Sequence, residues 1–316
     1  MTYKRVLVTG ATGFVGRAVF DAAVQHGHRP VAAVRDNGQS KAFGDVAVVG
    51  PIDGDTDWTH ALAACECVIH LAARVHVMAE TSSDPLGEFR RTNVEATLNL
   101  ARQAAASGVQ RFVYVSSVKV HGEKTLPGFA FRATDPYAPT DPYAISKMEA
   151  ELALVQWAET SGLELVIVRP PLVYGPGVKA NFAALVNAVK RGLPIPLGAV
   201  THNRRSLVAL DNLVDLLIRC LIHPRAAGGC FMVADGEDVS TSRLVFQIGQ
   251  ALGRPARLWF VPIVVLHVVA RLVGRSSAID RLCDSLQIDI QPTRDILGWT
   301  PPSSLDNALR KLTANP

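Results

Sequence analysis

The chain has 316 residues, of which 48% are hydrophobic and 19% are charged, and its formal net charge is +4. This length and apolar content suffice for a large buried core, and the scattered Lys and Arg residues argue against a nucleic-acid groove. Five irregularly spaced cysteines exclude a disulfide framework and a Cys-x-x-Cys metal site, so no metal is expected and a reducing, cytoplasmic compartment is favoured.

The first half of the chain alternates short apolar runs with longer helical patterns. The strand pattern starts within a few residues of Met1, which predicts that no signal peptide is present. The predicted strands are 5–9, 30–35, 46–49, 67–72, 111–116 and 164–170, and the predicted helices are 14–26, 86–107 and 143–161. Strands that are apolar on both faces and alternate with helices predict an α/β fold with a Rossmann-type, doubly wound parallel sheet.

A glycine-rich turn follows the first predicted strand. In "VLVTGATGFVGRAV", Gly10, Gly13 and Gly16 recur every third residue between this strand and a helix. Such glycines allow a tight turn, close approach of the backbone to a pyrophosphate, and close packing of the helix on the strand. The pattern predicts a dinucleotide site that also includes Phe14 and Val15.

The end of the second predicted strand indicates which dinucleotide binds. An NAD site usually presents a carboxylate here to the ribose 2′-hydroxyl, whereas a guanidinium suits a 2′-phosphate. The strand ends with Val34, Arg35 and Asp36, so Arg35 favours NADP(H), with NAD(H) as the alternative. Asp36 takes the acidic role instead if the strand runs one residue longer.

"DPYAISK" places a tyrosine and a lysine on one face of a predicted helix. Asp141 suits the N-cap and Pro142 the first turn, so Tyr143 and Lys147 lie one turn apart. A neighbouring ammonium lowers the pKa of a phenol, which predicts that Tyr143 transfers protons near neutrality. Ser117, after the fifth strand, offers a second hydroxyl, and the group predicts proton transfer coupled to hydride transfer at a nicotinamide.

The pattern becomes less regular after residue 170. We predict a Rossmann domain over 1–170, to which part of 206–225 returns, and a smaller C-terminal substrate-binding lobe over 171–316. The apolar run 258–273 is too short to span a bilayer. It predicts a buried or interfacial helix beginning near Pro262, with a membrane-contacting helix as the alternative.

These motifs together resemble the extended short-chain dehydrogenase/reductase family, and within it the NAD-dependent epimerase/dehydratase enzymes that are similar to UDP-glucose 4-epimerase. The resemblance covers essentially the whole chain. It is carried by "GATGFVG", "HLAA", "TNVEATLNL", "SSVKVHG", "YAISK", "RPPLVYGPG", "RRSLVALDNLV" and "LGW".

The resemblance implies a role for each matching residue. Tyr143 would be the acid/base, Lys147 would lower the pKa of Tyr143 and bind the nicotinamide ribose, and Ser117 would bind the reacting oxygen. The other implied cofactor contacts are Leu71, Ala72, Ala73, Asn93 and Pro170. The implied contacts with a UDP-sugar substrate are Asn181, Arg205, Arg281 and Asp284.

Departures from the family pattern reduce the number of activities that the resemblance implies. Val118 and Lys119 stand where related dehydratases carry an Asp-Glu pair, so dehydration lacks its acid and base. Pro51 stands where many relatives have an Asp near the adenine, which puts that contact in doubt.

The full pattern is most similar to the family's UDP-4-keto-6-deoxy-N-acetylglucosamine 4-reductases, which form UDP-N-acetylquinovosamine for surface polysaccharides. Together with Arg35, this favours an NADPH-dependent reduction of a C4 ketone. The first alternative is a UDP-hexose or UDP-N-acetylhexosamine 4-epimerase with tightly held NAD, and the second is a non-catalytic NADPH-binding protein. A homodimer without a transmembrane segment is expected.

Overall fold

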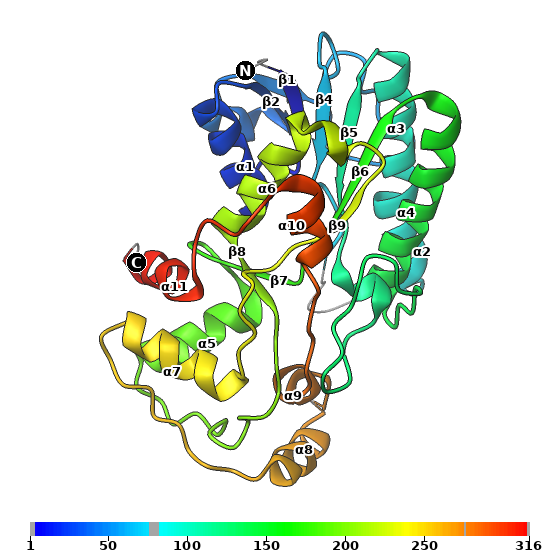
Figure 1. Ribbon diagram of the computed structural model, residues 1–316. Helices are drawn as coiled ribbons and strands as arrows, with labels where there is room; N and C mark the ends of the chain where they lie inside the picture. The colour runs from blue at the N-terminus through cyan, green and yellow to red at the C-terminus, as the bar shows by residue number, and fades with distance from the viewer. Residues whose placement is uncertain (1–3, 76–81, 275, 315–316) are drawn as a thin grey trace.

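The computed structural model describes residues 4–75, 82–274 and 276–314. Its main feature is a seven-stranded sheet in the order β3-β2-β1-β4-β5-β6-β9, in which every neighbouring pair is parallel (Figure 1). The strands are β1 (Arg5–Thr9), β2 (Arg29–Val34), β3 (Val46–Val48), β4 (Cys67–His70), β5 (Arg111–Val115), β6 (Glu164–Arg169) and β9 (Cys230–Met232). The predicted Rossmann-type α/β fold is confirmed.

Helices cover both faces of this sheet because its strands are apolar on both sides. One face carries α1 (Phe14–Gln25) and α6 (Leu210–Ile222). The other carries α3 (Ala96–Ala106) and α4 (Pro142–Ser161). Buried side chains such as Leu217 on the first face and Leu154 on the second fill the two layers between helices and strands.

The predicted helix 86–107 is wrong in one respect, because a π-helical turn at Arg91–Glu95 separates α2 (Pro85–Arg90) from α3. Single π-helical turns are frequent at functional sites. This one contains Asn93, whose buried side chain bonds to a neighbouring loop.

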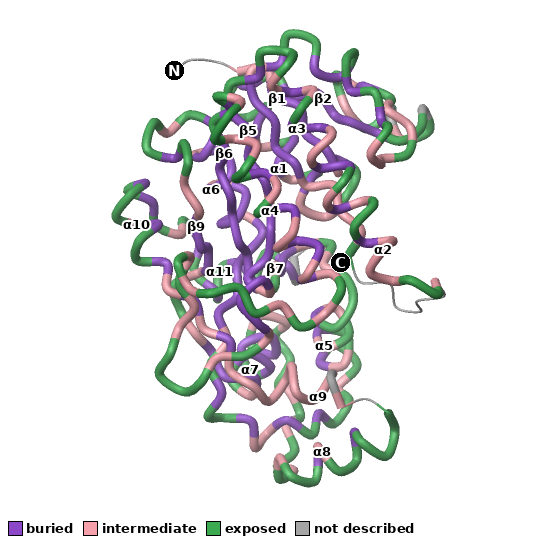
Figure 2. Tube along the Cα trace, turned by 90° about the vertical axis from the view of Figure 1, so that its right-hand side faces the viewer, coloured by how far each residue is buried: buried purple, intermediate pink, exposed green. Residues whose placement is uncertain are grey.

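The rest of the chain forms a second lobe with its own buried cluster, which includes Phe182, Ile248 and Leu309. Its short parallel sheet pairs β7 (Leu172–Tyr174) with β8 (Leu207–Ala209). Its helices are α5 (Ala180–Lys190), α7 (Thr241–Ala251), α8 (Ile263–Leu272), α9 (Ser276–Cys283) and α11 (Leu305–Ala314). In Figures 1 and 2, α8 lies at the end of the molecule opposite the N-terminal strands.

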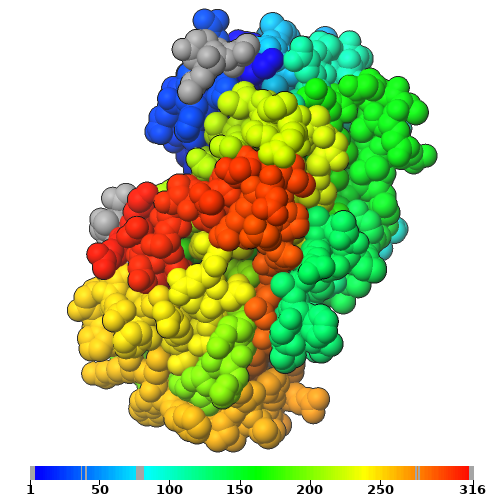
Figure 3. Space-filling view, in the orientation of Figure 1, coloured from blue at the N-terminus to red at the C-terminus, as the bar shows by residue number. Residues whose placement is uncertain are grey.

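Several segments of the second half return to the sheet. α6 packs on α1, within the range expected from 206–225, and β9 extends the sheet beside β6. α10 (Gln291–Leu297) then packs near β9, and Figure 3 shows the C-terminal segments in red across the middle of this face. The domain boundary at residue 170 stays a prediction.

In the described part of the chain, no helix combines the length and apolar character needed to cross a bilayer. All five cysteines are free thiols.

α8 begins directly after Pro262, as predicted. Only Leu266 and Ala270 of this helix are fully buried, so the helix is not the buried one that was one of the expectations. The cytoplasmic location and the homodimer stay predictions.

Candidate active site

A cavity of about 930 Å³ opens at the carboxyl ends of the parallel strands. Its wall includes a residue directly or closely after each of five strands: Gly10, Arg35, Leu71, Ser116 and Pro170. The volume lies within the range of roughly 300–1,000 Å³ that ligand pockets occupy. Doubly wound sheets bind their ligands at this edge.

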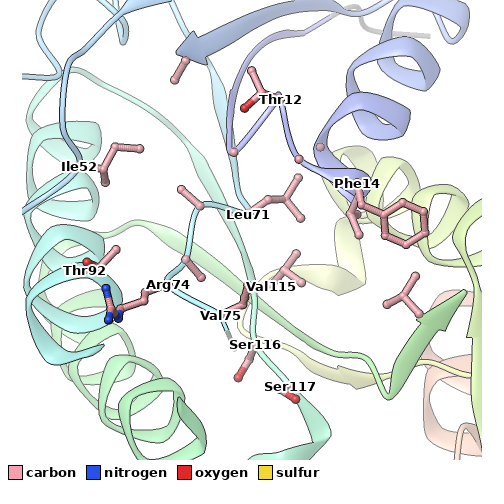
Figure 4. A pocket seen from close by; sticks show the side chains of 18 of the residues that line it. Thr12, Phe14, Ile52, Leu71, Arg74, Val75, Thr92, Val115, Ser116 and Ser117 are labelled. Atoms are coloured by element: carbon pink, nitrogen blue, oxygen red, sulfur yellow. The ribbon is translucent and has the colours of Figure 1, made fainter. Parts of the chain in front are cut away.

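The glycine turn forms one side of the cavity. Gly10 has a φ of +65°, and a Cβ added there would lie 2.9 Å from the backbone nitrogen of Ala72. A Cβ on Gly16 would lie only 2.0 Å from the carbonyl oxygen of Gly10. Both positions therefore require glycine, and the bare backbone faces the cavity together with Phe14 and Val15 (Figure 4).

A buried network fixes the loop after β4. Thr9 Oγ1 accepts hydrogen bonds from the backbone nitrogens of Leu71 and Ala72, each at 3.1 Å, and lies 2.7 Å from His70 Nδ1. Burial lowers the pKa of His70 to about 3, so its ring is neutral. Because Thr9 already accepts two bonds, its hydroxyl donates to Nδ1, and the proton on Nε2 points to Thr97 Oγ1 at 2.8 Å.

The three predicted catalytic residues meet at one wall of the cavity. Ser117 and Tyr143 both line it, and the Ser117 hydroxyl acts to lower the pKa of Tyr143. Lys147 also lines it and is 2% exposed. Its Nζ donates to the carbonyl oxygen of Val115 at 2.8 Å and lies 4.6 Å from the ring centroid of Tyr114.

The electrostatics of this wall differ from the expectation. Burial and the charge of Asp141 raise the pKa of Tyr143 to about 12, and the nearby Ser117 hydroxyl acts against this shift. Burial also lowers the pKa of Lys147 to about 7. The pKa of Tyr143 thus lies above its ordinary value, and Lys147 is not among the groups that shift it. The effect of Lys147 on Tyr143 stays a prediction, because an ammonium has three donors and only one of them is taken by Val115.

The opposite end of the cavity receives the residue after β2. This strand ends at Val34, and Arg35 lines the cavity beside Gln39 and Pro51. Asp36 is exposed and does not belong to the cavity wall. Arg35 is exposed as well, so the choice between Arg35 with NADP(H) and Asp36 with NAD(H) stays a prediction.

Asn93, a predicted cofactor contact, lies behind the cavity wall rather than in it. Its Oδ1 accepts from the backbone nitrogen of Arg74 at 2.8 Å, and its Nδ2 donates to the carbonyl oxygen of Arg74 at 3.0 Å and to Ser146 Oγ at 2.9 Å. Arg74 itself lines the cavity. Asn93 therefore ties the loop after β4 to the helix that carries Tyr143.

The cavity fits a nicotinamide dinucleotide. Besides the glycine turn, it offers Ser116, whose hydroxyl is buried at the wall and has no hydrogen-bond partner within the described residues. A buried hydroxyl of this kind is normally satisfied by a polar group. Residues 4–75, 82–274 and 276–314 contain no cluster of three His, Cys, Asp or Glu side chains that could hold a metal ion.

Three of the four predicted substrate contacts lie together in the second lobe. Arg205 donates to the carbonyl oxygen of Asp284 at 3.0 Å, and Arg281 Nε lies 3.6 Å from Glu123 Oε2. Burial lowers the pKa of Arg205, while the charges of Asp284 and Glu123 act against this shift. Asn181 is exposed in the first turn of α5. None of the four belongs to the cavity wall, so their substrate roles stay predictions.

A chain of ion pairs joins the two halves beside this cluster. Lys119 Nζ lies 2.6 Å from Glu123 Oε1 and 2.7 Å from Asp141 Oδ2. Asp141 caps α4, because its Oδ1 accepts from the backbone nitrogen of Ala144 at 2.7 Å. Glu123 in turn faces Arg281 of the second lobe. Lys119 stood out in the sequence as unusual, but spacing alone could not predict that it meets a residue 22 positions away.

Sequence reasoning also missed a buried ion pair behind the cavity wall. Glu151 is fully buried and accepts a hydrogen bond from Arg169 Nε at 3.0 Å. Arg169 NH1 lies 2.7 Å from His121 Nε2. Tyr143, Lys147 and Glu151 recur every four residues on one helix face, and this spacing is the signal that could have identified Glu151.

Comparisons with known proteins agree with this geometry. The family described as "NAD dependent epimerase/dehydratase family" matches residues 6–234. A UDP-glucose 4-epimerase from Vibrio cholerae is 44% identical over 308 residues, which cover 98% of this chain and 94% of that protein.

Two solved structures share the fold across almost their whole length. A UDP-glucose 4-epimerase from Thermotoga maritima with UDP-glucose has a TM-score of 0.79 at 21% identity and covers 98% of both chains. A UDP-glucuronic acid 4-epimerase from Bacillus cereus in complex with NAD also has a TM-score of 0.79, at 19% identity, with 98% of this chain and 96% of that chain covered.

Proposed function

The chain is an enzyme that belongs to the NAD-dependent epimerase/dehydratase family, and from this premise we propose that it is a UDP-sugar 4-epimerase. The proposed reaction inverts C4 of a UDP-linked hexose or N-acetylhexosamine. The observation that carries the proposal is 44% identity, over 98% of the chain, to a UDP-glucose 4-epimerase. Ser117, Tyr143 and Lys147 at one cavity wall support it.

In the proposed mechanism, the C4 hydroxyl of the sugar lies between Ser117 and Tyr143. Tyr143 takes the proton from the C4 oxygen as the alcohol becomes a ketone, and it returns a proton when the ketone is reduced. Ser117 holds the reacting oxygen, and Lys147, whose ammonium has donors beyond the one given to Val115, stabilises the phenolate. A bound nicotinamide supplies the acceptance and return of the hydride.

We propose the substrate contacts from the similarity to the UDP-sugar epimerases. The relative from Thermotoga maritima is described with UDP-glucose, which makes a UDP-sugar the proposed substrate class. Arg205, Arg281 and Asn181 would bind the diphosphate, and Asp284 the uridine ribose. Dehydration is not proposed, because Val118 is a buried apolar residue and Lys119 is held by two carboxylates.

A second candidate is the NADPH-dependent reduction of a UDP-4-keto-6-deoxy-N-acetylhexosamine, and Arg35 favours it. A 4-epimerase regenerates its dinucleotide in each turnover, and the relative from Bacillus cereus is described in complex with NAD. Arg35 lines the cavity at the end of β2, where a guanidinium suits the 2′-phosphate of NADP(H).

Three incubations of the purified protein distinguish these candidates. UDP-glucose and UDP-N-acetylglucosamine are supplied separately without cofactor, and the 4-keto-6-deoxy sugar is supplied with NADPH. We expect one of the first two to be converted to its 4-epimer. Consumption of NADPH with the ketosugar, without epimerisation of either sugar, would replace the first candidate by the second. Mass spectrometry of the nucleotide released on denaturation shows whether it carries a 2′-phosphate.

A further inference from the structure

An exposed apolar surface covers the tip of the second lobe. We call it the tip patch, and it comprises Trp259, Phe260, Val264, Val268, Leu272 and Val273. Phe260 is 78% exposed and Leu272 is 82% exposed. Figure 2 shows exposed residues along α8 at this end, and in Figure 3 the same end consists largely of yellow and orange segments. Contiguous apolar surfaces of this kind mark interaction sites.

The orientation of α8 is the reverse of an ordinary surface helix. Leu266 and Ala270 form its buried stripe. Val264, Val268 and Leu272, which are spaced four residues apart, form an apolar stripe that faces solvent. A surface helix normally places polar side chains there. The molecule by itself therefore leaves the most apolar face of this helix uncovered.

The chain segment that carries the tip patch contains basic but no acidic residues. Residues 239–274 contain four arginines and no Asp or Glu. Arg254, Arg257 and Arg271 are exposed, and none of them pairs with a carboxylate within the described residues. Two carboxylates outside this range contact it: Asp280 lies 3.3 Å from His267, and Glu237 lies 3.5 Å from Arg243. A partner for this surface therefore has to combine apolar and anionic groups.

We propose that the tip patch docks on the surface of an anionic lipid bilayer. α8 has 10 residues, too few to span a membrane, so it lies in the plane of the interface with its apolar stripe toward the acyl chains. Trp259 and Phe260 occupy the headgroup level, where aromatic rings are favoured. Arg257 and Arg271 contact anionic headgroups.

A second copy of the chain fits this surface less well. In a symmetric contact the same patch would meet itself, which brings the arginines of both copies to one interface without an acidic residue from 239–274 of either copy. The proposal is also independent of the sugar chemistry, because it uses no residue of the cavity. Docking would place the second lobe against the membrane and leave the sheet half pointing away from it.

The test is flotation of the full-length protein with two kinds of vesicle, phosphatidylcholine alone and phosphatidylcholine mixed with phosphatidylglycerol. We expect binding to the anionic vesicles that is at least about tenfold stronger than to the neutral ones and that weakens at high salt. The fluorescence of Trp259 should shift to shorter wavelength on binding, because this side chain is 61% exposed in the free protein.

Matched variants locate the contact. Val268→Glu with Leu272→Glu should reduce anionic-vesicle binding at least about tenfold, and Arg257→Gln with Arg271→Gln should reduce the preference for anionic lipid. Val24→Glu, on an exposed apolar residue of α1, should leave binding unchanged. Circular dichroism checks that each variant folds. No binding, equal loss with the α1 variant, or a solution dimer abolished by the α8 changes would overturn the proposal.

Discussion

The sheet half and the second lobe are ordered by different interactions. In the sheet half, seven parallel strands in the order β3-β2-β1-β4-β5-β6-β9 bury continuous apolar layers on both faces. In the lobe, β7 and β8 are three residues each, and polar side chains hold the connecting segments. Asp235 accepts from the backbone nitrogen of Ala209 and from Asn212 at 2.7 Å each, and Asn203 donates to the carbonyl oxygen of Leu282 at 3.0 Å.

This difference separates the reaction from the choice of substrate. Ser117, Tyr143 and Lys147 lie at the ends of the strands or on a helix packed against them, so the fold positions them firmly. Arg205 and Asp284 lie in connecting segments of the lobe. Such segments can change without disturbing the sheet, which allows one redox centre to serve different sugars.

The largest loss of turnover should come from a substitution in the sheet half. Tyr143→Phe removes the proposed acid/base group and should lower turnover by roughly 10²–10⁴-fold while the protein still binds dinucleotide. Turnover is followed by chromatography of the UDP-sugars, and dinucleotide binding by calorimetry. Tyr137→Phe is the control, because its hydroxyl bonds to Glu151 outside the cavity. Full activity of the Tyr143 variant would remove this residue from the mechanism.

Removal of one carboxylate from each half compares how the two halves are stabilised. Glu151→Ala leaves Arg169 charged and buried, and it should lower the free energy of unfolding by about 3–5 kcal/mol. Asp235→Ala removes the hydrogen bonds from the backbone nitrogen of Ala209 and from Asn212 at a half-buried position, and it should cost about 1–3 kcal/mol. Urea denaturation followed by circular dichroism measures both. Equal losses would mean that the two halves are not stabilised differently.

Removal of a lobe arginine should affect binding more than chemistry. Arg281→Gln should raise KM for the UDP-sugar about tenfold, the loss expected for a charged hydrogen bond, with little change in kcat. Steady-state kinetics separate the two constants. Arg225→Gln, on the sheet side of the molecule, should leave both unchanged. A fall in kcat with unchanged KM would show that Arg281 acts on the reaction rather than on binding.

The smallest change in activity is expected from a substitution where the two halves meet. Lys119 pairs with Asp141, whose negative charge raises the pKa of Tyr143. Lys119→Met leaves that charge unpaired, so the pKa of Tyr143 rises further and its basic form requires a higher pH. The acidic limb of the kcat–pH profile should therefore move up by about one pH unit or less.

Lys311→Met is the control for this shift, because it removes a Lys–Asp pair of similar length, 2.6 Å, elsewhere in the lobe. The kcat–pH profile of the Lys311→Met variant should not shift. An unshifted Lys119→Met profile would mean that the ion-pair chain does not act on Tyr143.

Sequence reasoning succeeded where local patterns determine the structure. Strand and helix periodicity predicted the sheet, and motif spacing brought Ser117, Tyr143 and Lys147 to one wall. It failed where contacts between segments distant in the sequence determine the position of a side chain. Asn93 lies in a π-helical turn and bonds to Arg74 behind the cavity wall, and Lys147 donates to the carbonyl oxygen of Val115. Neither position leaves a periodic signal in the chain.

Hydride transfer at C4 can be followed most directly with UDP-glucose and UDP-N-acetylglucosamine, each carrying deuterium at that carbon, incubated with the enzyme and an excess of unlabelled NADH. The account predicts that one of them forms its 4-epimer with the label retained at C4, because the hydride leaves and returns without release of the dinucleotide. Loss of the label to the added NADH, or no change of configuration at C4 in either sugar, would contradict it.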